Sequence, residues 1–150
     1  MKRKLPITAS VILAAVIILS ALYTAHTDYS RTLKANWGFQ LPHLSRYAQV
    51  YQMQEENQSG DGIRYHVFSY RYEDYIDIMF AWRTRQDYTL HHPTYADAAV
   101  TWLDKLGVPE DKRPDYDRCF YWYRLGEDES EIIIFWHTEE NRLYILENMI

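Results

Sequence analysis

The chain has 150 residues, with 16 Lys and Arg against 21 Asp and Glu and a formal net charge of −5. An acidic surface is repelled by nucleic acid phosphates, so the composition argues against a nucleic-acid-binding protein. The single cysteine, Cys119, excludes an internal disulfide and any site that needs paired cysteines. We therefore expect a fold that is stabilised by its core alone.

The first 27 residues predict that the chain is targeted to a membrane. Three basic residues, Lys2–Lys4, precede an uncharged stretch from Leu5 to Thr27. Taken as a helix, Leu5–Ala25 reaches about 30 Å at about 1.5 Å per residue, which matches the hydrocarbon thickness of a bilayer. We predict a signal anchor over residues 1–27 that crosses the cell membrane once as a transmembrane helix.

A cleaved signal peptide is the alternative, since a basic start and an apolar core also characterise secretory signals. The best cleavage frame ends at Tyr23-Thr24-Ala25, where a bulky tyrosine occupies a position that signal peptidases require to be small. We favour the uncleaved anchor over a domain that is secreted after cleavage. The basic N-terminal flank predicts, by the positive-inside rule, a cytoplasmic N-terminus and a C-terminal domain outside the membrane.

Beyond the anchor, residues 28–35 are polar and predict a juxtamembrane linker, and residues 36–150 predict a single extracytoplasmic domain. Two runs of alternating residues, Arg46–Met53 and Arg64–Tyr72, have the period of a β-strand. The glycines of Gly60-Asp-Gly62 between them permit a turn, so we expect the two runs to form a β-hairpin.

Two helices are predicted after the hairpin. The first spans Glu73–Trp82, where acidic residues at the start and basic residues just after the end complement a helix dipole. The second is Tyr95–Leu106, whose apolar residues recur at helical spacing. A capping box at Thr94 and Asp97 marks its start, and Gly107 marks its end.

Three short aromatic or β-branched runs follow, separated by the short acidic connections of an antiparallel meander. They are Cys119–Leu125, Glu131–His137 and Arg142–Glu147. The order of elements predicts an α+β fold, in which an N-terminal transmembrane helix precedes a small antiparallel sheet. The hairpin and the three-strand meander make up this sheet, and the two helices pack on one of its faces.

The aromatic content is high, with 14 Tyr, 5 Trp and 5 Phe. Tyr and Trp bury a large area at small entropic cost, so they are common in recognition surfaces. We predict that aromatic residues of the meander form a binding surface and that Trp122 shares one face of the sheet with Phe135 and Tyr144. Burial of both faces is the alternative. The predicted surface consists of Trp122, Phe135, Trp136 and Tyr144.

The sequence contains no GxSxG, Walker, GxGxxG or HExxH pattern, so no catalytic motif points to an enzyme. We expect no cofactor and no metal site. A membrane-tethered hydrolase is the alternative, in which His66 or His137 forms an acid–base pair with Glu73. The two histidines would also approach each other if the strands that carry them lie side by side.

Three segments resemble those of a known group of proteins. They are Asn36-Trp-Gly-Phe-Gln-Leu-Pro42, Gly60-Asp-Gly-Ile-Arg-Tyr-His-Val-Phe68 and Arg142-Leu-Tyr-Ile-Leu-Glu147. The chain resembles small, N-terminally membrane-anchored proteins of unknown function from Gram-positive bacteria. The resemblance implies a cell-surface address and supplies no activity. We therefore predict a membrane-anchored interaction module whose partner is another protein of the cell envelope.

Overall fold

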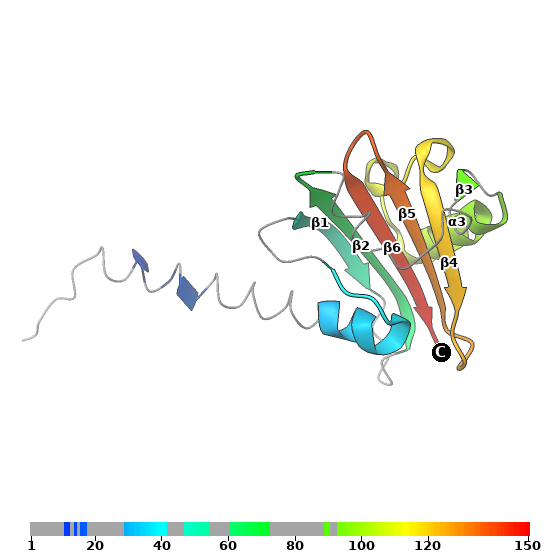
Figure 1. Ribbon diagram of the computed structural model, residues 1–150, viewed down its shortest axis with the longest axis horizontal. Coiled ribbons are helices and arrows are strands. Elements are labelled where there is room, and N and C mark those ends of the chain that lie inside the picture. The colour runs from blue at the N-terminus through cyan, green and yellow to red at the C-terminus, as the bar shows by residue number, and fades with distance from the viewer. Residues whose placement is uncertain are drawn as a thin grey trace, which may run out of the picture. The chain divides into compact units, whose positions relative to one another are not determined.

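The structure is a computed structural model that describes residues 11–12, 14, 16–17, 29–41, 47–54, 61–72, 89–90 and 93–150 (Figure 1). The chain divides into two units, Met1–Leu44 and Ser45–Ile150. In the first unit, the described residues of the predicted anchor are helical. The rest of that anchor lies outside the described residues. Within the part that is described, no helix is both long enough and apolar enough to cross a membrane.

Residues 29–37 form a helix in the first unit, so most of the predicted linker is helical. Gly38 ends this helix with φ +79°, a conformation that glycine adopts without strain. Its N–H donates to the carbonyl of Lys34 at 3.1 Å, which satisfies an orphan carbonyl of the last turn. Four large apolar side chains of residues 29–41 are buried: Leu33, Trp37, Phe39 and Leu41.

The second unit contains a six-stranded antiparallel sheet with the order β1-β2-β6-β5-β4-β3. Its strands are β1 (Tyr47–Gln54), β2 (Gly62–Tyr70), β3 (Thr89–Leu90), β4 (Phe120–Leu125), β5 (Glu131–His137) and β6 (Arg142–Met149). The predicted α+β class, the antiparallel hairpin and the antiparallel meander are confirmed. The additional strand β3 pairs with β4 at the end of the meander.

Pairing between β2 and β6 joins the hairpin to the meander, and Figure 1 shows β6 between β2 and β5. The register runs from Gly62 opposite Met149 to Ser69 opposite Arg142. These two strands are far apart in the sequence, so no turn fixes their pairing. Burial of their side chains sets the register instead, because a slip of one residue would turn every core side chain to the wrong face.

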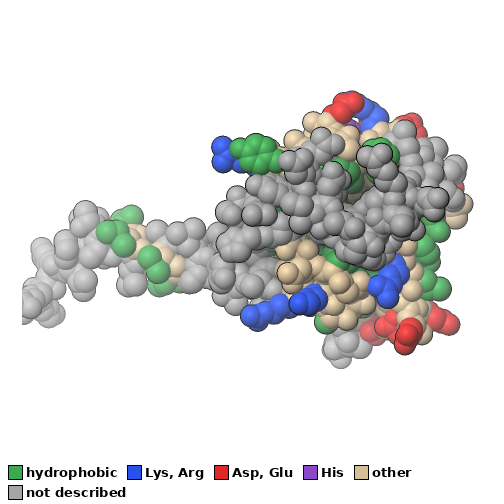
Figure 2. Space-filling view, viewed as in Figure 1, with side chains coloured by type: hydrophobic (Ala, Val, Ile, Leu, Met, Phe, Trp, Pro, Cys, Tyr) green, Lys and Arg blue, Asp and Glu red, His purple; other side chains and the backbone are tan. Residues whose placement is uncertain are grey.

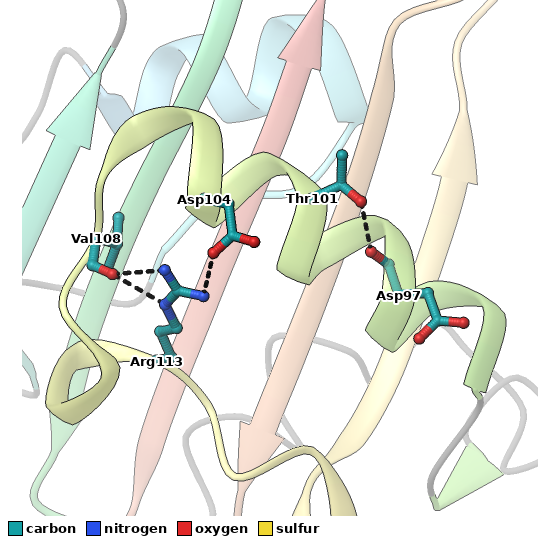
Figure 3. A network of polar contacts seen from close by, with 5 residues as sticks. All are labelled: Asp97, Thr101, Asp104, Val108 and Arg113. Atoms are coloured by element: carbon teal, nitrogen blue, oxygen red, sulfur yellow. Dashed lines mark hydrogen bonds and ion pairs between the residues drawn. The ribbon is translucent and has the colours of Figure 1, made fainter.

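α3 (Pro93–Leu106) lies across one face of the sheet, as Figure 3 shows. Its residues Ala99, Trp102 and Leu103 belong to the same core cluster as side chains of β2, β5 and β6. The helix begins at Pro93, so the predicted capping role of Thr94 is wrong. Proline is favoured at the first helical position because the missing N–H has no partner there. The other predicted helix, over residues 73–82, lies outside the described residues.

Arg113 holds the end of α3 to the loop that follows it (Figure 3). Its Nε and Nη2 donate to the carbonyl of Val108 at 2.9 and 2.7 Å, and its Nη1 donates to Asp104 at 2.7 Å. Gly107 has φ +66°, as expected for the residue that ends a helix. The contacts of Arg113 and the left-handed conformation of Gly107 both lie at the end of α3, where the sequence predicted the helix to end.

Candidate functional site: an open strand edge

The four aromatic residues that were predicted to form a binding surface are buried. Trp122, Phe135 and Tyr144 are each 3 % exposed, and Trp136 is 7 % exposed. The prediction of an exposed aromatic surface is therefore wrong. Consecutive residues of β5 and β6, including Phe135, Trp136 and Tyr144, are buried whichever way they point, so both faces of the sheet are covered there. In β4, Trp122 is the buried residue of an otherwise partly exposed strand.

These aromatic residues also lie on two different faces. Phe135 is opposite Tyr144, and both belong to the core cluster under α3. Trp122 is opposite Ile134, the neighbour of Phe135 in β5, so it lies on the other face. The prediction that Trp122 shares a face with Phe135 and Tyr144 is wrong, because it required a register that differs by one residue.

The structure does not bring the two histidines of the hydrolase hypothesis together. β6 separates β2, which carries His66, from β5, which carries His137. His66 is opposite Ile145, whereas His137 is opposite Arg142. Since Ile145 and Arg142 are an odd number of residues apart in β6, the two histidines lie on opposite faces. Glu73 lies outside the described residues.

His137 stabilises the turn between β5 and β6. Its Nδ1 accepts a hydrogen bond from the backbone N–H of Glu140 at 3.2 Å. With Nδ1 as the acceptor, the neutral imidazole carries its proton on Nε2. Asn141 follows with φ +50°, a left-handed conformation that asparagine tolerates in turns. The position of His137 is therefore explained by the turn.

Glu147 is a buried carboxyl side chain that the sequence patterns did not single out. It is 0 % exposed, and the register of β2 and β6 places Arg64 directly opposite it. A buried carboxylate is costly unless a cation or hydrogen bonds compensate for the lost water. Arg64 is the cation that the register brings to this position. The available sequence signal was the alternation of Glu147 with Leu143 and Ile145, which places all three on one face.

Cys119 lies in the core among tyrosines. Burial raises the pKa of Cys119 to about 12 and that of Tyr116 to about 12. Burial also raises the pKa of Tyr65 and Tyr144. The hydroxyl of Tyr65 donates to the carbonyl of Lys112 at 2.5 Å. A thiol with a raised pKa is a poor nucleophile at neutral pH, so this cluster is structural.

β1 forms the long edge of the sheet. It stands at one end of the strand order, and among the described strands only β2 pairs with it. Its eight residues, Tyr-Ala-Gln-Val-Tyr-Gln-Met-Gln, include no charge, no proline and no glycine. Edge strands are usually protected by charge, proline or short length. The exposed residues of β1 are Ala48, Gln49, Val50, Gln52 and Gln54.

Aromatic contacts fix β1 to its neighbour β2. The ring of Tyr47 stacks on Tyr70 with centroids 5.5 Å apart and meets Phe68 edge-on at 5.3 Å. On the other face of the sheet, Tyr51 meets Tyr65 edge-on at 6.0 Å. These contacts use the two faces of the sheet, and no strand of the described residues pairs with the outer side of β1. β1 is therefore an ordered edge and does not need to fold in order to bind.

A β-bulge interrupts this edge at Val50, where the register with β2 shifts between Gln49 and Tyr51. The extra residue places Gln49 and Gln52 on the same face, opposite Phe68 and His66 of β2. Gln49 Nε2 donates to Gln52 Oε1 at 2.5 Å. Beyond this bond, the exposed side chains of the pair retain the carbonyl oxygen of Gln49 and both amide N–H groups of Gln52.

β3 forms the opposite edge and, within the described residues, consists of Thr89 and Leu90. So short a strand offers few backbone groups to another chain. β1 is therefore the candidate interaction site. The period of Arg46–Met53 predicted a strand but did not identify it as an edge, because the sheet order depends on the pairing of β2 with β6.

Other surfaces give a weaker indication of function. On the face of the molecule that Figure 2 shows, the described acidic and basic side chains lie in small separate groups. Within the described ranges, no three His, Cys, Asp or Glu side chains are grouped closely enough to hold a metal ion. In comparisons with known proteins, no family model, no curated protein and no solved structure matches this chain.

Proposed function

We propose that this chain is a membrane-anchored interaction module that binds an extended segment of another cell-envelope protein along β1. The observation that carries the proposal is the exposed, uncharged, eight-residue edge of the sheet. In strand addition, the backbone of a partner satisfies the outer N–H and C=O groups of such an edge. Each hydrogen bond gained in this way contributes about 0.5–1.5 kcal/mol.

The proposed anchor is the apolar segment over residues 1–27, and the interaction domain lies outside the membrane. Within that segment, the described side chains Val11, Ile12, Val16 and Ile17 are between 55 and 64 % exposed. A row of exposed aliphatic side chains is unfavourable in water and is stabilised by lipid. Such an anchor would hold β1 near other proteins of the envelope and raise their effective concentration.

The bulge at Val50 supports selective binding over general adhesion. It divides the edge into Tyr47–Gln49 and Tyr51–Gln54, which have different registers with β2. A flat strand can follow one of these runs, whereas a strand with a matching bend can follow both. The exposed Val50 side chain, 52 % exposed, lies at the point where the two runs meet and gives the partner an apolar contact.

Hydrogen–deuterium exchange of the full-length protein tests this proposal. The exchange of Tyr47–Gln54 is compared between membranes of the producing cells and dilute detergent, in which partners dissociate. We expect exchange in the membrane to be about tenfold slower, which corresponds to about 1.4 kcal/mol of pairing energy. Equal exchange rates in the two preparations would remove the proposal.

Two lysine substitutions at exposed apolar residues provide a matched comparison. Val50 is 52 % exposed in β1, and Leu125 is 56 % exposed at the end of β4. Lysine on a strand edge opposes the approach of another strand. We expect Val50→Lys to abolish the membrane-dependent protection and Leu125→Lys to retain it. The same loss in both variants would indicate a general change in the protein and contradict a site at β1.

A further inference from the structure

We propose that the segment bound along β1 is β1 of a second copy of this chain, so that two copies join their sheets edge to edge about a twofold axis. This inference rests on the proposed function and names the partner for the same site. It is drawn from the charge of β1, the positions of its glutamines and the order of the strands.

Charge favours β1 as the place where two copies meet. The whole chain has a formal net charge of −5, so two copies repel each other over most relative orientations. β1 contributes no charge to either side of a contact. Direct apposition of two β1 strands therefore brings no charged residue of one strand against a charged residue of the other.

The glutamine side chains of β1 in one copy are complementary to those of β1 in a second copy. Twofold symmetry requires two β1 strands to run antiparallel. A register centred between Val50 and Tyr51 places Gln49 opposite Gln52 of the second copy. Within one copy, Gln49 Nε2 already donates to Gln52 Oε1, which leaves the carbonyl oxygen of Gln49 and both amide N–H groups of Gln52. The antiparallel pairing brings these remaining groups together on both sides of the axis.

The bulge is compatible with the same arrangement. It lies at Val50, next to the proposed axis, so the bend in one copy meets the identical bend in the other. A strand without such a bend would follow only part of the edge. A second copy therefore provides the matching shape without any further assumption about its sequence.

The order of the strands limits the assembly to a dimer. The sheet has β1 at one end and the two-residue strand β3 at the other. Pairing through β1 uses both long edges and leaves a β3 edge at each end of the joined sheet. Such short edges offer little to a third copy. The contact is therefore isologous and closed, in contrast to the open growth of a fibre.

The membrane anchor determines how strong this contact is. A pair of single strands buries less area than the roughly 1,200–2,000 Å² of a stable protein interface. We therefore expect weak association in dilute solution. Two copies that are anchored in one membrane have a much higher effective concentration, so the same contact forms there.

Disulfide formation between two full-length variants tests the register. Gln49→Cys and Gln52→Cys proteins with different tags are mixed in vesicles of phosphatidylcholine and phosphatidylglycerol and oxidised gently. Cys119 is 0 % exposed and can remain in place. We expect roughly tenfold more mixed disulfide than between Gln49→Cys and Leu125→Cys, because only the first pair is held face to face. Equal yields from the two mixtures would overturn the inference.

The natural side chains are tested by counting photobleaching steps of singly labelled protein in the same vesicles. We expect paired steps for the unchanged chain and for Leu125→Lys, and single steps for Val50→Lys. Single steps for all three proteins would overturn the inference. If β1 still exchanges slowly in cell membranes in that case, the partner is a different envelope protein and the proposed function stands. Loss of that protection as well would remove both proposals.

Discussion

β1 and β6 are strands of equal length, eight residues each, with opposite environments. β6 carries Arg142 and Glu147, yet five consecutive residues of this strand are buried. β1 carries no charge, yet most of its residues are exposed. Polarity alone therefore does not decide which strand enters the core. The position in the sheet decides it, because β6 is covered by neighbours on both sides and β1 has a neighbour on one side.

This difference between the two strands suggests that β6 stabilises the domain and that the outer side of β1 is available for binding. In β6, the buried carboxyl group of Glu147 lies opposite Arg64 of the adjoining strand, where a cation is placed to compensate for the lost water. In β1, exposed neutral side chains and an open backbone edge add little to the core, so they are available to a partner. We therefore expect changes in the centre of the sheet to alter the free energy of unfolding, and changes on the outer side of β1 to alter association.

Alkaline pH should have the largest effect on the centre of the sheet. Burial holds the pKa of Cys119 at about 12 and raises the pKa of Tyr65, Tyr70 and Tyr144 above that of free tyrosine. Because the folded-state pKa values are raised, this stability is fully present below the unfolded values and is lost as pH rises above about 10. Each group contributes up to about 1.4 kcal/mol per pH unit.

Tyrosinate absorbance and circular dichroism, recorded together against pH, measure this effect. We expect the buried tyrosines to ionise in the same transition that unfolds the protein. Tyr70→Phe should move the midpoint to higher pH, because the Tyr70 hydroxyl is buried and makes no hydrogen bond within the described part of the chain. Ionisation of all tyrosines near pH 10 in a protein that stays folded would contradict burial as the cause.

The next largest expected effect is on the free energy of unfolding, and it is measured by truncating two neighbours of Tyr65, one in β6 and one in β1. Leu146 of β6 and Met53 of β1 are both opposite Tyr65, on its two sides. Leu146 is 0 % exposed, whereas Met53 is partly exposed. We expect Leu146→Ala to lower the free energy of unfolding by about 3–4 kcal/mol and Met53→Ala by about 1 kcal/mol. Urea denaturation measures both, and equal losses would contradict the difference between the strands.

The sequence was sufficient for elements that depend on local patterns. The period-two run Glu131–His137 coincides with β5, and the predicted helix ends at the glycine that terminates α3. The fold class followed from the order of these elements. Each of these results depends on residues that are close together in the chain, where side-chain periodicity and turn chemistry determine the conformation.

The candidate site depends on long-range pairing, so the sequence could not identify it. Alternation over Arg46–Met53 is the same for an edge strand and for a central strand with one polar face. Only the pairing of β2 with β6 shows that β1 stands at the edge. The face of Trp122 also depended on the register between β4 and β5, which the sequence of β4 does not specify.

A smaller effect on the free energy of unfolding is expected at the buried carboxyl group of Glu147 in β6. Removing Arg64 leaves Glu147 without the cation that faces it, and Arg64→Met should lower the free energy of unfolding by about 2 kcal/mol. Glu147→Gln in the same chain should restore most of the loss, because no buried charge then remains. A double-mutant cycle in urea measures this coupling. Additive losses would show that Arg64 does not compensate Glu147.

A substitution on the outer side of β1 should have the smallest effect on the free energy of unfolding. It tests most directly whether β1 serves association while β6 serves stability. Val50 is 52 % exposed at a bulge, so Val50→Lys should change the free energy of unfolding by less than about 0.5 kcal/mol. The same substitution should remove association in membranes, because lysine blocks the approach of a second strand. Loss of association together with a large loss of stability would mean that β1 belongs to the core. Loss of association alone would assign this strand to interaction, as its exposed and uncharged sequence indicates.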